Sequence, residues 1–402
     1  MTNRRSIAAV GDVTDVNCWS GIPFHFWKAA QALDFADGPW RVDLTKMQWP
    51  RRIWNGVRLL CGHSPGGFQY SRAFMRRVCA QIPADLFRSE IITFHQHFPP
   101  AAMVTLAGGG LNHYLDATFA SLTSNRGLDL QLPVDVVAQG RELERTNYAA
   151  SRRIVTMARW TAESVIQECG AASEKVSTIL PGANLELPAG YILPVAPLPQ
   201  RAGKERDFVL GFVGMDWRRK GLPFLIEVRD DLCRRGWKTV VLAAGDVPAD
   251  LAHRAGVRFV GRIDKRNEPG AFLSFLRQCD LGCLFSTNEA LGISTLEFLR
   301  AGVPVAGFAH QGLADTLPPD AGFRFLPTAS PSDVADHFEQ YLMDEPRQAA
   351  FHRHAAQWSP FLTWERCVRE MMELWQHGSV ASPVRPWLGL ESHLTVCSSS
   401  RS

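Results

Sequence analysis

Short apolar runs that alternate with amphipathic segments most limit the fold of this 402-residue chain. In its second half, runs typical of buried strands lie at 208–213, 239–243, 257–260, 281–285 and 303–306, with helix candidates between them near 221–235, 269–278 and 294–300. This repetition predicts a doubly wound parallel sheet, whose ligands bind at the carboxyl ends of the strands.

The first half repeats the pattern less regularly. Strand candidates lie at 7–11, 91–94, 113–115, 153–157 and 176–180, and helix candidates begin near Pro23, Ser71, Asp135 and Thr161. A stretch rich in Pro, Gly and Ala, 187–203, separates the halves and is typical of a linker. The chain is also too long for one ordinary core. Two Rossmann-like domains facing across a cleft are therefore expected.

We place the domain boundaries by this pattern. The N-terminal domain is predicted at 1–190, a linker at 191–206, the C-terminal domain at 207–358, a further helix at 359–376, and a disordered tail at 377–402.

Composition excludes several classes of protein. A net charge of +3 gives no indication of a nucleic-acid partner. No apolar run reaches the roughly 18 residues of a membrane span, and the N-terminus lacks the apolar core of a signal peptide. Nine scattered cysteines without a CxxC pattern are typical of reduced thiols rather than of a metal site. We therefore expect a cytoplasmic protein.

Basic side chains gather in the first half, at Arg51, Arg52, Arg72, Arg76 and Arg77. They fit either a solvated helical face or contact with an anionic membrane surface, and the sequence leaves both open.

The stretch FVGMDWRRKGL, residues 212–222, carries a first candidate site. Arg218, Arg219 and Lys220 lie where a strand turns into a helix. Free amides and the dipole at a helix N-terminus attract anions, and these side chains add three positive charges. The turn suits a diphosphate, with a solvated basic turn as the alternative.

The stretch NEALGISTLEFLRAGVPVAGF, residues 288–308, carries a second one. Glu289 follows a buried strand and Glu297 lies inside the next helix. Each carboxylate can accept sugar or ribose hydroxyls. The alternative is that Glu289 stabilises the helix N-terminus and Glu297 is exposed. Because both loops follow strands of one sheet, they are expected at the same edge. A site that binds phosphates at one loop and hydroxyls at the other suits a nucleotide-sugar.

These motifs resemble the retaining glycosyltransferases of family 4, which have the two-domain GT-B fold. The two glutamates separated by seven residues, the following Ala-Gly-Val-Pro-Val, the FVG…KG loop and the segment 142–184, which ends in PGAN, all match the family's pattern. The resemblance covers about residues 6 to 376, and it implies that the helix at 359–376 crosses back to the N-terminal domain.

The resemblance implies a role for each motif residue. Lys220, with Arg219 or Arg218, neutralises the leaving diphosphate. Glu297 holds the ribose, and Glu289 contacts the transferred sugar.

It also implies backbone contacts to the donor. The amides of Leu291, Gly292 and Ile293 bind sugar or phosphate oxygens. Gly21, in WSGIPFH, opens the first helix beside the diphosphate, with a plain turn glycine as the alternative.

Two departures from the family pattern leave questions open. Gly214-Met215 stands where many relatives have Gly-Arg, so the sequence does not say which arginine contacts the diphosphate. Relatives often carry a histidine near the transferred sugar, and the counterpart here is Asp116 or else His95 or His97.

The implied function is a hexosyltransferase-type enzyme. It moves a sugar from a nucleotide-diphosphate sugar to a hydroxyl with retention of configuration, and it needs no metal or other cofactor. Cell-surface polysaccharide or glycoconjugate synthesis is the expected setting, with an oligosaccharide or lipid-linked acceptor at the cytoplasmic membrane face. The alternatives are a GT-B nucleotide-sugar epimerase and a catalytically silent binding scaffold. A dinucleotide-binding protein is disfavoured because no strand precedes a GxGxxG motif.

Overall fold

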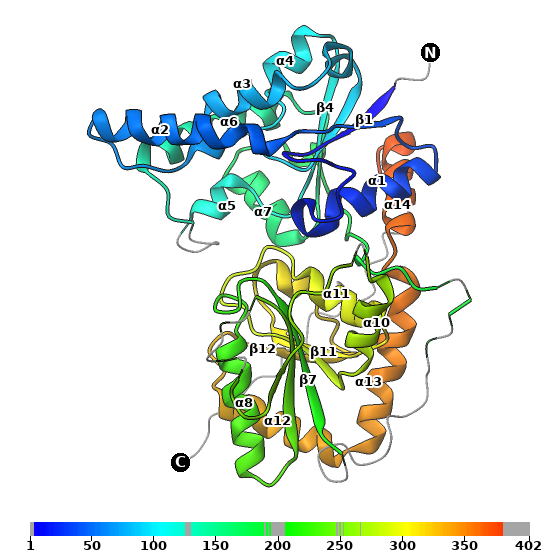
Figure 1. Cartoon of the computed structure of the whole chain (residues 1–402). Helices are drawn as coiled ribbons and strands as arrows, with labels where there is room; N and C mark the ends of the chain where they lie inside the picture. The colour runs from blue at the N-terminus through cyan, green and yellow to red at the C-terminus, as the bar shows by residue number, and fades with distance from the viewer. Residues whose placement is uncertain are drawn as a thin grey trace. The chain divides into compact units, whose positions relative to one another are not determined.

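The computed structural model describes residues 4–124, 130–188, 190–191, 193, 206–246, 248, 251, 253–265 and 267–380. These residues form two compact units (Figure 1). The first comprises the described residues up to Pro181 together with 364–380, and the second comprises the described residues from Gly182 to Thr363. Most of the predicted linker at 191–206, and the predicted tail beyond residue 380, lie outside the described residues.

The first unit is built on a six-stranded parallel sheet with the order β2-β1-β3-β4-β5-β6. Its strands are β1 (Arg5–Ala8), β2 (Gly38–Pro39), β3 (Glu90–Thr93), β4 (Gly110–Leu115), β5 (Arg153–Thr156) and β6 (Val176–Thr178). Its helices are α1 (Ile22–Ala32), α2 (Gln48–Leu60), α3 (Arg72–Cys79), α4 (Ala101–Leu106), α5 (Phe119–Thr123), α6 (Val134–Ala150), α7 (Arg159–Gln167) and α14 (Trp364–His377). The chain continues from β2, on one side of β1, to β3 on the other, so the topological switch point lies between β1 and β3.

The final helix, α14, is part of this first unit. Its buried face includes Val368 and Met371, and the ring of Trp364 lies edge-on to Phe26 of α1 at 6.1 Å. Trp375 donates from its indole nitrogen to Glu90 of β3 at 2.8 Å. The aromatic side chains of α14 therefore serve packing.

The second unit has a parallel sheet with the order β12-β11-β10-β7-β8-β9. Its strands are β7 (Phe208–Gly214), β8 (Thr239–Gly245), β9 (Val257–Phe259), β10 (Leu281–Leu284), β11 (Val305–Phe308) and β12 (Gly322–Phe325). Its helices are α8 (Leu222–Arg234), α10 (Pro269–Arg277), α11 (Ile293–Arg300), α12 (Pro331–Met343) and α13 (Glu345–Trp358). The chain moves outward from β7 to β9 and then returns to the other side of β7, so the switch point lies between β7 and β10.

The predicted α/β fold class is confirmed, and each predicted strand overlaps an observed one. The sequence reading missed β2 and β12 and the helices α2, α4, α5 and α13. Strand β11 begins at Val305 rather than at 303, because Pro304 has no amide hydrogen to donate to a ladder.

Aromatic rings make up much of the core of the second unit. The ring centre of Phe323 in β12 lies 5.4 and 5.5 Å from the ring centres of Phe338 and Tyr341 in α12. At the start of β7, the buried carboxylate of Asp280 accepts two hydrogen bonds from Arg206 at 2.5 and 2.8 Å and one from the amide of Val209 at 2.8 Å. This ion pair fixes β7 beside β10.

We expect Arg206→Ala to destabilise the second unit by about 2–3 kcal/mol, because it leaves a buried carboxylate without its cation. The exposed pair between Arg258 and Asp207 in the same unit is the matched control. Arg258→Ala should cost at most about 1 kcal/mol. Urea denaturation of both variants measures this difference, and equal losses would contradict a special role for the buried pair.

Candidate active site

Two left-handed glycines begin the helices that follow β7 and β10. Gly221 (φ 80°) precedes α8 and Gly292 (φ 80°) precedes α11, and neither helix has a side-chain N-cap. A Cβ atom on Gly221 would lie 2.1 Å from the carbonyl oxygen of Phe285, so the loop after β7 presses directly on the end of β10. Only glycine combines this backbone conformation with so close an approach. The two loops therefore meet at the switch point.

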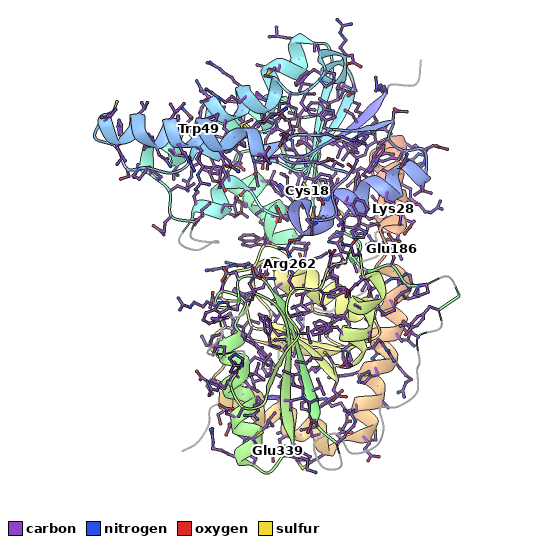
Figure 2. All side chains as sticks on the ribbon, in the orientation of Figure 1. Cys18, Lys28, Trp49, Glu186, Arg262 and Glu339 are labelled. Atoms are coloured by element: carbon purple, nitrogen blue, oxygen red, sulfur yellow. The ribbon has the colours of Figure 1, made fainter. Side chains whose placement is uncertain are left out.

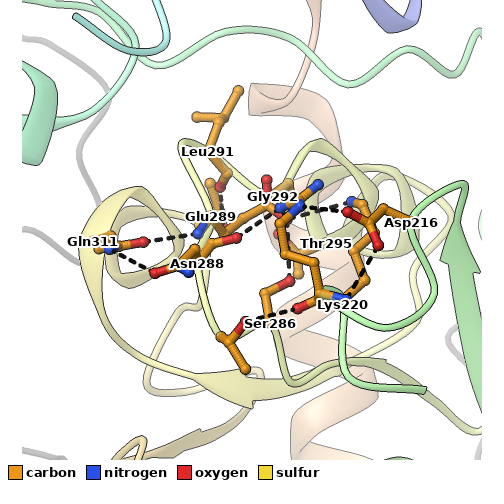
Figure 3. Close-up of polar contacts among 12 residues, drawn as sticks. Asp216, Lys220, Ser286, Asn288, Glu289, Leu291, Gly292, Thr295 and Gln311 are labelled. Carbon is orange, nitrogen blue, oxygen red and sulfur yellow. Dashed lines mark hydrogen bonds and ion pairs between the residues drawn. The ribbon is translucent and has the colours of Figure 1, made fainter. Parts of the chain in front are cut away.

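Three charged side chains converge there (Figure 3). Lys220 Nζ lies 3.4 Å from Glu289 Oε2, and Arg219 donates to the same oxygen at 3.2 Å. The side chains of Lys220 and Glu289 are 14% and 11% exposed, so water screens their attraction only weakly. Two cations therefore share one buried carboxylate here, and the further carboxylate that pairs with Arg219, that of Asp216, is 55% exposed.

Neutral and acidic neighbours hold the cluster in place. Ser286 donates to Glu289 Oε2 at 3.1 Å, and the Glu289 amide donates to Gln311 at 2.8 Å. Arg219 also donates to the carbonyl of Asn288 at 2.6 Å and to Asp216 at 3.2 Å. The loops after β7, β10 and β11 thus build a single polar site. The sequence reading did not single out Ser286, Gln311 or Asp216.

Burial alone raises the pKa of the Glu289 carboxyl, but the charges of Lys220 and Arg219 outweigh it and hold that pKa below its ordinary value. Glu289 is therefore ionised at neutral pH. It can accept hydrogen bonds from hydroxyl groups.

Glu297 lies apart from this cluster, inside α11, and its side chain is 2% exposed. Its carboxylate pairs with Lys265 at 2.6 Å, and Lys265 Nζ also lies 3.8 Å from the ring centre of Phe272. The alternative that Glu297 is merely exposed is wrong. The sequence reading missed Lys265, because a lysine in the loop between β9 and α10 has no periodic pattern to mark it.

Arg218 and Arg219 point to different partners. Arg219 reaches Glu289, whereas the guanidinium of Arg218 lies over the ring of Trp217 at 4.8 Å. Leu291, Gly292 and Ile293 form the turn into α11, as the sequence predicted, and the Leu291 carbonyl accepts from Thr316 at 3.0 Å. The donor contacts of their amides stay predictions.

Gly21 lies at the switch point of the first unit. It has φ 86° and precedes α1 directly after Trp19 and Ser20, which both also have positive φ. Such a run is costly for residues with a Cβ, and a hydrogen bond from Trp19 to the Val10 carbonyl at 3.0 Å fixes it. The role of Gly21 beside a diphosphate stays a prediction.

His95 follows β3, and its ring centre lies 5.6 Å from that of Trp19. His95 is buried, and its Nδ1 accepts from the amide of His97 at 3.0 Å. Burial, together with His97 and His113, lowers the pKa of His95 well below its ordinary value. His95 is thus a neutral imidazole at this edge of the sheet.

Asp116 lies one residue past β4, the strand next to β3. It is half-buried, and its carbonyl accepts from the Thr161 hydroxyl at 2.5 Å. The structure thus places two of the three acceptor-side candidates, His95 and Asp116, at the carboxyl ends of neighbouring strands, and the third, the buried His97, lies two residues after His95. It does not choose between them.

Among the residues that the structure describes, no group of three or more His, Cys, Asp or Glu side chains is placed to hold a metal ion. In the same residues, no helix is long and apolar enough to cross a membrane.

The two Rossmann-like sheets define the GT-B class of fold. Residues 198–358, which include both site loops, match the family model Glycosyl transferases group 1. The structure of Anabaena HepE in complex with UDP and glucose is similar, with a TM-score of 0.62 and 15% identity over 93% of this chain and 99% of that one. At this identity the likeness shows the fold alone.

Two relatives extend the comparison. A D-inositol 3-phosphate glycosyltransferase from Xylanimonas cellulosilytica is 25% identical over 260 residues, which cover 61% of this chain and 62% of the relative. A glycogen synthase from Deinococcus radiodurans is 31% identical over 199 residues, which cover 47% and 43%. The matches therefore span less than two thirds of either relative.

The depressed pKa of Glu289 gives a pH signature. Its contribution to folding is fully present above the ordinary glutamate pKa of 4.5 and is lost as the pH falls through the lower folded value. The free energy of unfolding of the native chain should therefore fall more steeply on acidification below about pH 4.5 than that of Glu289→Gln. Urea denaturation at several pH values between 7 and 3 tests this. Parallel pH profiles would show that the pKa of Glu289 is not depressed.

Proposed function

We propose that this chain is a retaining glycosyltransferase of family 4, which moves a sugar from a nucleotide-diphosphate sugar to a hydroxyl acceptor. The observation that carries the proposal is the convergence of Lys220 and Arg219 on Glu289 at the switch point between β7 and β10. The match of this region to group 1 glycosyl transferases supports it. UDP and glucose in the similar HepE structure suit the same donor class.

The donor diphosphate would take the two cations. In its absence Lys220 and Arg219 face the Glu289 carboxylate, and an incoming diphosphate carries more charge than that carboxylate. Lys220 and Arg219 would shift toward the phosphate oxygens, next to the open N-terminus of α8. Glu289 would then be free to accept hydroxyls of the transferred sugar.

The chemical step follows from this placement. The acceptor oxygen forms a bond to the anomeric carbon while the bond from that carbon to the diphosphate oxygen breaks. Attack comes from the same face, so the departing phosphate oxygen takes the acceptor proton and the configuration is retained. Lys220 and Arg219 stabilise the charge that develops on the leaving diphosphate. We propose that this pair does so without a metal ion or other cofactor.

Glu297 would hold the ribose of the donor. Lys265 is then a positioning residue, because its ion pair at 2.6 Å fixes the direction of the Glu297 carboxylate inside α11. A carboxylate already held in place loses little freedom when two hydroxyls bind to it.

The acceptor side is proposed in the first unit. The switch point there is lined by Trp19 and the neutral His95, so it suits an uncharged hydroxyl better than a second anion. We propose an acceptor from cell-surface polysaccharide or glycoconjugate synthesis, presented at the cytoplasmic face of a membrane. An epimerase would instead turn over the donor with no acceptor, and a silent scaffold would not turn it over at all.

The main test is Lys220→Ala. Removing the cation should lower the transfer rate by about 10²–10³-fold, because the charge on the leaving diphosphate loses a partner in a poorly hydrated site. Arg234→Ala, at the far end of α8 and largely exposed, is the control and should keep its activity. A panel of nucleotide sugars is first screened by thermal stabilisation, and product configuration is read by NMR.

Near-native transfer by Lys220→Ala would contradict the assigned role of the lysine. Acceptor-independent conversion of the donor would favour the epimerase. A product of inverted configuration would overturn retention while leaving the donor site intact.

Lys265 is tested separately by Lys265→Met. Loss of the ion pair leaves Glu297 poorly oriented, so the KM for the donor should rise about tenfold while kcat changes less. Lys265→Arg keeps a cation beside Glu297 and should restore most of the affinity. If Lys265→Met lowers kcat without affecting KM, Lys265 acts on the reaction and not on ribose binding.

A further inference from the structure

Helix α2 presents an apolar face to solvent. Trp49, Ile53, Val57 and Leu60 are 71%, 61%, 53% and 90% exposed. They recur at intervals of four, four and three residues, so they form one stripe along the helix. An ordinary surface helix buries such a stripe.

The opposite side of α2 packs on the first unit through hydrogen bonds and through Trp54, whose ring centre lies 5.9 Å from that of Phe68. Arg58 is buried and donates two hydrogen bonds to Asp135 of α6 at 2.6 and 2.8 Å. It donates a third to the Ser64 carbonyl at 2.6 Å, and Trp54 donates to the Gly66 carbonyl at 2.9 Å. These bonds fix the orientation of α2, so its apolar stripe stays on the solvent side.

The segment of sequence that carries this stripe has charges of one sign. Between Asp43 and Asp85 the sequence has no acidic residue, and it has seven basic ones: Lys46, Arg51, Arg52, Arg58, Arg72, Arg76 and Arg77. The net charge of the whole chain is only +3, so the rest of the chain is net negative. Arg51 and Arg52 are exposed, and the Arg52 guanidinium lies 5.3 Å from the ring centre of Trp49. The surface that α2 offers is therefore both apolar and cationic.

We propose that α2 docks the protein on an anionic lipid bilayer. The apolar stripe, shared by Trp49, Ile53, Val57 and Leu60 (Trp49 is labelled in Figure 2), would enter the boundary between headgroups and acyl chains. Tryptophan is favoured at that depth. Arg52, beside Trp49 at the edge of the stripe, would meet the lipid phosphates, and the exposed Arg51, on the far side of the helix, would add a longer-range attraction.

The charge pattern disfavours a second copy of this chain as the occupant. A symmetric dimer through α2 would bring two such segments, both cationic and both free of carboxylates, face to face. Like charges at an interface oppose association. An anionic bilayer matches the apolar stripe and the cations together. This inference does not depend on the proposed transfer reaction.

Vesicle flotation with the full chain tests the proposal. The native protein should float with vesicles of phosphatidylcholine containing 30% phosphatidylglycerol and bind weakly to phosphatidylcholine alone. Ile53→Glu, which places a charge in the apolar stripe, should lower the partition coefficient at least tenfold. Arg51→Gln/Arg52→Gln should lower it about tenfold at low ionic strength and less at high salt.

Matched controls lie elsewhere on the chain. Met343→Glu changes an exposed apolar side chain of the second unit, and Arg145→Gln/Arg369→Gln removes two exposed arginines of the first. Both should float like the native protein. All of these side chains are exposed, so far-UV circular dichroism should be unchanged.

Three results would overturn the proposal. The first is a native protein that does not float with anionic vesicles, as expected if α2 fits the groove of an acidic protein instead. The second is equal flotation of Ile53→Glu. The third is a dimer in sedimentation velocity that Ile53→Glu abolishes. Donor turnover is measured in parallel without vesicles. A variant that loses flotation but keeps turnover has lost membrane docking alone, so failure of this proposal is distinguished from failure of the proposed reaction.

Discussion

The close approach of Gly221 to the Phe285 carbonyl is the contact on which the second unit's site depends. It brings the beginning of α8 onto the end of β10, although 64 residues of sequence separate the two. Lys220, one residue before this contact, is thereby delivered to Glu289, four residues after it. A side chain at position 221 would separate the loops and with them the charges. The switch point between β7 and β10 thus becomes a site because a backbone, and not a side chain, fills the space between its loops.

The charges at that site are unequally buried, and this difference matters for ligand binding. Lys220 and Arg219 share the buried carboxylate of Glu289, and the further partner of Arg219, Asp216, is 55% exposed and screened by water. Glu297 and Lys265 balance each other. An anion therefore gains most at the first cluster, and a ligand rich in neutral hydroxyls is better suited to the second. A nucleotide-sugar carries a diphosphate and a ribose in one molecule. We therefore propose that the diphosphate lies at Lys220 and Arg219 and the ribose at Glu297.

Much of this architecture could be predicted from the sequence, because strands buried on both faces of a parallel sheet read as continuous apolar runs. Strand β2 was missed because it has only two residues. The convergence of Lys220 with Glu289 followed from the rule that parallel strands end at one edge. Which of Arg218 and Arg219 reaches Glu289 could not be predicted in this way, because it depends on their contacts to Trp217 and Asp216 within one turn.

Helix α2 shows a different limit of sequence patterns. Its periodicity indicates two unlike faces, but it does not say which one the protein covers. That choice depends on Asp135, which lies 77 residues further along the chain, and the Arg58 guanidinium holds the pKa of this carboxyl at about 2. Asp135 is therefore charged at any physiological pH, and the pair holds Arg58 inward. Because α2 cannot turn its apolar stripe inward without breaking that pair, the stripe stays available to an outside surface. The pair is only partly buried, because the Asp135 side chain is 52% exposed, and such pairs add little stability. Here the pair fixes the orientation of α2, and orientation is what a docking helix requires.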